Sequence, residues 1–145
     1  MRRQSHPLNT CGGLPIKPEL TYLVWVTILT GLLWLPYVLD RIGVWGLADT
    51  VGYPDAPKLQ SPWARRMKAA HSNAIENLVV FATLVLVANA TGISNAATVF
   101  AAALYFWSRL VHAVAYTFAL PWVRTLAFAG GFVAQAIFAW QLVVR

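Results

Sequence analysis

Residues 65–77 read RRMKAAHSNAIEN, and an apolar run over residues 78–90 follows directly. Ionisable side chains close to hydrocarbon are costly, so their presence at the start of such a run needs a reason. Helical spacing places four polar side chains on one face of this segment: Arg66, Asn73, Glu76 and Asn77. We predict that a membrane helix begins here and carries a polar stripe into the bilayer. Helix starts also collect polar caps and interfacial cations, which is an equally good explanation for the basic residues alone.

The composition of the whole chain is that of a membrane protein. Of its 145 residues, 59% are hydrophobic and only 11% are charged, whereas a soluble domain averages about 25% charged residues. The net charge of +6 does not predict nucleic-acid binding, because the cations are few and scattered among apolar runs. We interpret them as membrane-flanking and binding residues instead.

Two regions follow from this composition: an N-terminal tail, residues 1–18, and a membrane domain, residues 19–145. The tail contains prolines, glycines and cations, and no apolar segment precedes Leu20, so it does not resemble a complete cleavable signal peptide. Its Cys11 is the one cysteine of the chain and can form neither an intrachain disulfide nor a metal site.

The membrane domain is predicted to be an all-α bundle with four membrane-spanning helices. About 20 apolar residues are needed to cross a bilayer, and four segments satisfy this length: residues 20–39, 69–90, 96–118 and 123–144. Pro36 is expected to kink the end of the first span. Residues 42–64 form a loop with a short interfacial helix at 44–51, and Ser94 or Asn95 caps the third span. Gly130 and Gly131 allow close helix packing.

Four spans place both termini on the same side of the membrane. The connections between the first and second spans, and between the third and fourth, are bordered by cations, whereas the short connection between the second and third has none. The positive-inside rule therefore favours termini outside.

The same topology brings polar residues of all four spans to one end of the bundle: Arg41, Arg66, Asn73, Glu76, Arg109, His112, Tyr116 and Arg124. Intramembrane ionisable groups usually face a bundle interior or a wet cavity. Cations outnumber Glu76 here, so we predict a cavity that prefers an anion, for which arginine is a suitable partner. A purely structural network of Glu76 with Arg109 or Arg66 is the alternative. The opposite end of the bundle is expected to be nearly free of such groups.

Other chemistries have little support in the sequence. His71 and His112 lack the HExxH spacing of a zinc site, so we predict no metal. No serine nucleophile elbow or glycine-rich phosphate loop is present.

Two stretches resemble the signatures of a known family. ARRMKAAHSNAIEN, residues 64–77, and RLVHAVAYTFALPWVRTLAF, residues 109–128, are similar to the second-helix and third-to-fourth-helix signatures of the MAPEG proteins, the membrane-associated proteins of eicosanoid and glutathione metabolism. The bacterial members are the most similar in the first span, which suggests a bacterial inner membrane. The resemblance implies a homotrimer of left-handed four-helix bundles that binds glutathione between subunits near the cytoplasmic face. It also implies glutathione transfer to lipophilic electrophiles, or peroxide reduction.

The resemblance also assigns roles to individual residues. Arg124 matches the arginine proposed to stabilise the glutathione thiolate. The implied glutathione-binding residues are Arg41, Arg66, Asn73, Glu76, Arg109 and Tyr116. Ala69, Ser72 and Phe128 depart from the family pattern, in which two arginines and a tyrosine are common. The alternative is therefore a non-catalytic protein of the same fold that binds a lipid or another anionic ligand or acts as a scaffold.

Overall fold

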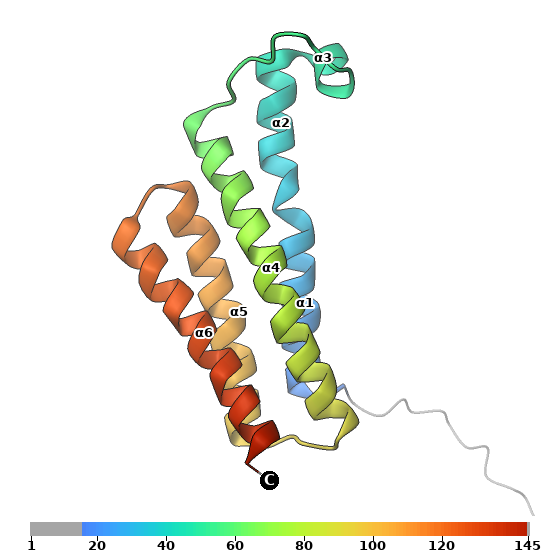
Figure 1. The fold of residues 1–145 in the computed structure, drawn as a ribbon, viewed down its shortest axis with the longest axis vertical. Helices are drawn as coiled ribbons and strands as arrows, with labels where there is room; N and C mark the ends of the chain where they lie inside the picture. The colour runs from blue at the N-terminus through green and yellow to red at the C-terminus, as the bar shows by residue number, and fades with distance from the viewer. Residues whose placement is uncertain (1–15, 145) are drawn as a thin grey trace, which may run out of the picture.

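A computed structural model describes residues 16–144, and Cys11 with most of the predicted N-terminal tail lies outside this range. Six helices follow one another along the chain: α1 (Pro18–Leu32), α2 (Trp34–Trp45), α3 (Leu47–Val51), α4 (Pro62–Ala90), α5 (Ala96–Thr117) and α6 (Pro121–Val143). Four continuous segments are long and apolar enough to cross a membrane: Pro18–Trp45, Pro62–Ala90, Ala96–Thr117 and Pro121–Val143. The prediction of an all-α protein with four membrane spans is confirmed (Figure 1).

The first span is longer than predicted and is divided at Leu33. The break lies three residues before Pro36, whose ring conflicts with the carbonyl group four residues earlier and which lacks an N–H donor. The Leu33 amide bonds to the carbonyl oxygen of Thr30 at 3.3 Å, which tightens the final turn of α1. The predicted end at residue 39 was wrong, because α2 continues through Asp40 to Trp45. A helix can carry charged residues once it leaves the hydrocarbon, so charge does not mark its end.

The second span also begins earlier than hydropathy indicates. α4 starts at Pro62 rather than residue 69, with proline in the first turn, where its missing N–H costs no helical bond. The predicted third span, residues 96–118, differs from α5 by one residue at its end. Asn95 caps it by accepting hydrogen bonds from the backbone amides of Ala97 and Thr98 at 2.9 and 3.1 Å.

The helices form two arms that separate toward one end (Figure 1). α5 and α6 make an antiparallel hairpin, and α1 packs against both α4 and α5. Beyond the break, α2 follows α4, and both extend past the turn that joins α5 to α6. The start of α1 and the end of α6 lie at the same end of the bundle, as four spans require.

The core is small and built from aromatic and alanine side chains. Phe81 of α4 stacks on Tyr105 of α5 with ring centres 3.7 Å apart, and it meets Phe138 of α6 edge-on at 5.8 Å. Aromatic pairs of this kind contribute about 0.5–1.5 kcal/mol beyond the burial of their area. Buried alanines on α4, α5 and α6 allow the helices to approach closely, which is how membrane helices associate.

The opposite end of the bundle, expected to be nearly free of ionisable groups, contains a buried carboxylate. Glu19, in the first turn of α1, is only 5% exposed. Its Oε1 accepts hydrogen bonds from Thr98 at 2.6 Å and from Ser94 at 2.8 Å. This carboxylate therefore ties the start of α1 to the α4–α5 connection, a contact between segments far apart in sequence.

Candidate functional site

A buried arginine lies at the centre of the polar stripe. Arg109 and His112 on α5 are each 3% exposed. Nη1 of Arg109 donates a hydrogen bond to Oδ1 of Asn73 on α4 at 3.0 Å. Nε and Nη2 of Arg109 form no hydrogen bond with any described residue. A buried guanidinium with one neutral partner retains a full positive charge and unused donors, which an anion could satisfy.

Two aromatic rings complete the surroundings of this guanidinium. The carbon Cζ of Arg109 lies 5.2 Å from the ring centre of Tyr105 and 5.6 Å from that of Phe128. Ring faces attract cations, and the attraction strengthens when water is excluded. The aromatic contacts therefore help to hold the charge in place without neutralising it.

Two consecutive glycines on α6 make room for the polar face of α5. A Cβ atom added at Gly131 would lie 2.6 Å from Nη2 of Arg109, and one at Gly130 would lie 2.6 Å from Oγ of Ser108. The prediction of close helix packing at these glycines is confirmed. The space left by the missing side chain of Gly131 is occupied by the arginine.

A cavity of about 310 Å³ lies between α4, α5 and α6, and Arg109 contacts two of its lining residues, Asn73 and Phe128, without lining it itself. Its lining residues are Asn73, His112, Tyr116, Arg124, Thr125 and Phe128. Arg124, half-buried in the first turn of α6, lies over the ring of Tyr116 with 5.0 Å between Cζ and the ring centre. The lining contains polar groups and a cation but no carboxylate, which is the composition expected of an anion site.

Arg66 brings a third cation to the same end. Its Nε donates to the carbonyl oxygen of Thr117, the last residue of α5, at 2.9 Å. Together with Tyr116 and Arg124 it lines an adjoining cavity of about 190 Å³ under the α5–α6 turn. Three arginines from three helices thus surround one region within a single chain: Arg66, Arg109 and Arg124.

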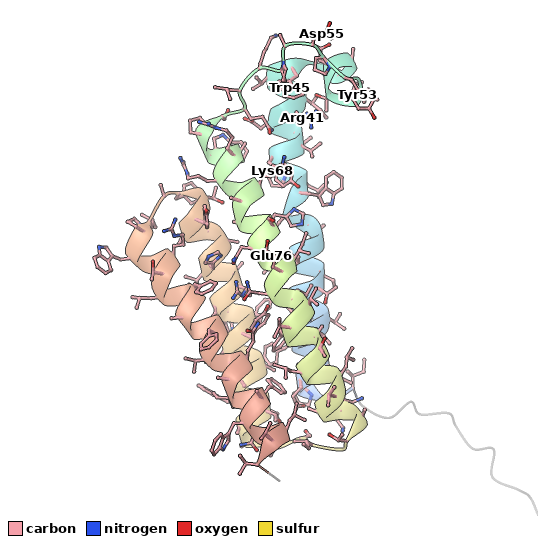
Figure 2. All side chains as sticks on the ribbon, in the orientation of Figure 1. Arg41, Trp45, Tyr53, Asp55, Lys68 and Glu76 are labelled. Carbon is pink, nitrogen blue, oxygen red and sulfur yellow. The ribbon has the colours of Figure 1, made fainter. Side chains whose placement is uncertain are left out.

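The structure does not bring the remaining two residues into this cluster. Arg41 lies over the ring of Trp45 at 4.0 Å, on α2 near the end of the bundle. Glu76 is exposed about halfway along α4, and among residues 16–144 its carboxylate accepts one hydrogen bond, from Ser72 at 3.5 Å (Figure 2). Neither arginine of the predicted structural network pairs with Glu76, because Arg109 bonds to Asn73 and Arg66 to Thr117.

Sequence reasoning gave too little weight to two further polar residues. Nε2 of Gln135, an amide in the apolar middle of α6, donates to the carbonyl oxygen of Asn77 at 3.1 Å. Nδ2 of Asn77 in turn donates to the carbonyl oxygen of Asn73 at 2.9 Å. An isolated amide in a membrane helix was the available signal, since it must find a partner inside the bundle.

The comparison with known proteins identifies the family of this chain. The sequence profile of the MAPEG family matches residues 22–144, nearly the whole chain. This chain belongs to the MAPEG family. No curated relative was found to match it. Family membership together with four spanning helices makes this MAPEG protein an integral membrane protein associated with the lipid bilayer.

Proposed function

We propose that this MAPEG protein binds glutathione and transfers it to lipophilic electrophiles, or uses it to reduce lipid hydroperoxides. The observation that carries the proposal is that Arg109, a buried cation with two nitrogens that bond to no described residue, donates a hydrogen bond to Asn73, which lines the same cavity as Arg124. Glutathione carries two carboxylates, and glutathione use is typical of the family to which the chain belongs.

The residues present fit the chemistry of this ligand. Arginine donors form forked hydrogen bonds with carboxylates and remain charged at any accessible pH. Asn73 and Tyr116 add neutral groups that can bond to peptide atoms of the ligand. An apolar electrophile can arrive through the bilayer, since the cavity lies among membrane-spanning helices.

Arg124 is assigned the catalytic role. Bound glutathione would supply a thiol as the nucleophile, so no nucleophilic side chain of the protein is required. A guanidinium close to a thiol stabilises its deprotonated, reactive form. Tyr116, whose ring faces the Arg124 guanidinium, would position that side chain.

Arg41 and Glu76 fit the proposal only if a second copy of the chain contributes to the site. An exposed carboxylate in the middle of a membrane helix is unfavourable against lipid. In the homotrimer that we propose, Glu76 and Arg41 would each face a neighbouring copy, at different levels along the bundle. Such a trimer would lie in a bacterial inner membrane, with its termini outside.

The test compares two arginines of similar chemistry and different position. Protein purified in detergent is assayed for conjugation of glutathione to a chloronitroarene, and glutathione binding is measured by calorimetry. Arg124→Ala should lower the conjugation rate by about 10²-fold, the loss seen when one preorganised donor is removed. Arg65→Ala removes an exposed cation from α4 and should leave the rate unchanged. No rate above background in the unmutated protein, with no binding at millimolar glutathione, would overturn the proposal.

The second candidate is a non-catalytic MAPEG protein that binds a lipid headgroup or another anion, or acts as a scaffold. It is favoured by Phe128, which borders the cavity without the hydroxyl of the tyrosine that is common in the family pattern. In that case Arg109→Ala should lower the thermal stability in detergent, and no glutathione-dependent turnover should be detected. Turnover in the unmutated protein separates the two functions, because only the first predicts it.

A further inference from the structure

A second, apolar cavity lies on a different face of α5. Its volume is about 420 Å³, and α1, α4 and α5 form its walls. The main lining residues are Leu29, Leu33, Trp63, Met67, Leu110 and Val114. None of them belongs to the arginine cluster.

The break in the first span explains why this cavity exists. At Leu33 the chain leaves α1, and α2 then packs against α4 rather than α5. The final turns of α5 are therefore uncovered on this side, where Val114 is 49% and Phe118 is 69% exposed. A recess remains between the two arms of the bundle.

The lining of the cavity is almost entirely apolar. Its side-chain donors are the indole N–H of Trp63 and the hydroxyl of Thr117, which already donates to the carbonyl oxygen of Ala113 at 2.8 Å. The carbonyl oxygen of Thr117 accepts the bond from Arg66. Cavities without polar partners do not hold ordered water, so hydrocarbon is the natural content of this one. The volume lies in the range of ligand sites, about 300–1,000 Å³.

We propose that this cavity binds one acyl chain of an anionic phospholipid from the surrounding bilayer. The charge at its polar end selects the headgroup. Residues 52–70, which include the Trp63 end of the cavity, contain three cations outside the arginine cluster, Lys58, Arg65 and Lys68, and one acid, Asp55. Basic clusters at a membrane surface attract anionic lipids by about 1 kcal/mol per residue.

A helix of a second copy is a poorer occupant than an acyl chain. One turn of a helix with its side chains fills about 400–600 Å³, so the cavity would hold a single turn at most. A flexible chain, by contrast, can follow the narrow space along α5. The proposal does not depend on glutathione chemistry, because the cavity and the arginine cluster occupy different faces of α5.

The test uses phosphatidylglycerol that carries a photoreactive diazirine in one acyl chain. The full-length protein is reconstituted in vesicles, irradiated, digested, and its lipid adducts are mapped by mass spectrometry. Val114→Trp fills the cavity from a position 49% exposed, so folding should be preserved. Val133→Trp is the matched control, because Val133 on α6 is also 49% exposed and lines none of the cavities described above.

Adducts should concentrate on Leu29, Met67 and Leu110, exceeding those on exposed α6 residues such as Val133. Val114→Trp should reduce them to the α6 level, and Val133→Trp should not. A phosphatidylcholine probe should label the cavity less strongly.

Labelling of the cavity residues equal to that of the exposed α6 residues would show that the lipid is ordinary boundary lipid, and this would overturn the proposal. Displacement by excess free fatty acid would overturn the choice of a phospholipid. A change of oligomeric state in Val114→Trp, without cavity labelling, would assign the cavity to a second copy and also overturn it.

Discussion

Gly131 of α6 lies directly against the guanidinium of Arg109 on α5. A Cβ atom at residue 131 would approach Nη2 to 2.6 Å, Nε to 3.1 Å and Cζ to 3.2 Å. The glycine and the buried charge therefore form one unit. The arginine can occupy the interior of the bundle because the neighbouring helix has no side chain at that position.

The first prediction concerns this pair. In Gly131→Ala the new methyl group should displace the guanidinium and weaken its bond to Asn73, because the far end of a side chain moves more easily than backbone. Glutathione affinity should fall, and overpacking should cost about 1–3 kcal/mol of stability. Calorimetry and thermal unfolding in detergent measure both effects. Gly31→Ala is the control, because a Cβ at Gly31 meets nothing within 4 Å. Unchanged glutathione binding in Gly131→Ala would contradict the assigned role of Arg109.

Asn73→Asp should separate stability from binding. A carboxylate in place of the amide can pair with Arg109 across the 3.0 Å hydrogen bond and neutralise its charge. We expect stability to be kept while affinity for an anionic ligand falls at least about tenfold, which corresponds to about 1.4 kcal/mol. Asn89→Asp adds the same charge at the far end of α4 and should leave binding intact. Equal losses in the two variants would point to net charge rather than to Arg109.

Glu19 should matter for stability alone. Its Oε1 accepts two hydrogen bonds, and bonds to a charged group contribute about 1.5–3 kcal/mol each. Glu19→Ala should therefore lower the unfolding temperature, and Glu19→Gln, which keeps an acceptor oxygen, should lower it less. Because Glu19 lies at the opposite end from the arginine cluster, the conjugation activity of the remaining folded protein should not change. A selective loss of activity would contradict this separation.

The loop before α4 should open more readily when one of the hydrogen bonds that hold it is removed. Nε2 of Gln60 donates to the carbonyl oxygen of Tyr37 at 2.7 Å, and Nε1 of Trp45 donates to that of Lys58 at 2.7 Å. One such bond contributes about 0.5–1.5 kcal/mol, so Gln60→Ala should speed tryptic cleavage after Lys58 about two- to tenfold. Tyr53→Phe, which changes a fully exposed side chain in the same loop, should leave the rate unchanged. Equal rates in both variants would show that the Gln60 bond does not restrain the loop.

Hydropathy and helical spacing were sufficient for the four spans and for part of the site. Polar stripes on two antiparallel helices placed Asn73 and Arg109 at the same end of the bundle, but the hydrogen bond between them was not predicted. The start of α4 was missed because its first two turns are polar, and polar helix outside hydrocarbon resembles a loop. The extent of α2 was missed for the same reason.

The position of Glu76 could not be read from spacing alone. Three residues along a helix correspond to a rotation of about 60° between side chains, which is enough to put Asn73 against α5 and leave Glu76 exposed. Which side of α4 faces another helix depends on how the neighbouring helices are arranged around it. The sequence indicates that side only where a polar residue on another helix, such as Arg109, identifies the partner.

The unequal length of the two arms affects how a ligand can reach the arginine cluster. α4, with 29 residues, is about 43 Å long, whereas α5, with 22, is about 33 Å. A bilayer core about 30 Å thick is therefore matched by the α5–α6 hairpin and exceeded by α4 and by the continuous α1–α2 span, Pro18–Trp45. One side of the protein thus projects beyond the bilayer core, whereas the α5–α6 turn ends close to its surface. On that lower side, a peptide dissolved in water would reach Arg124 without entering the hydrocarbon.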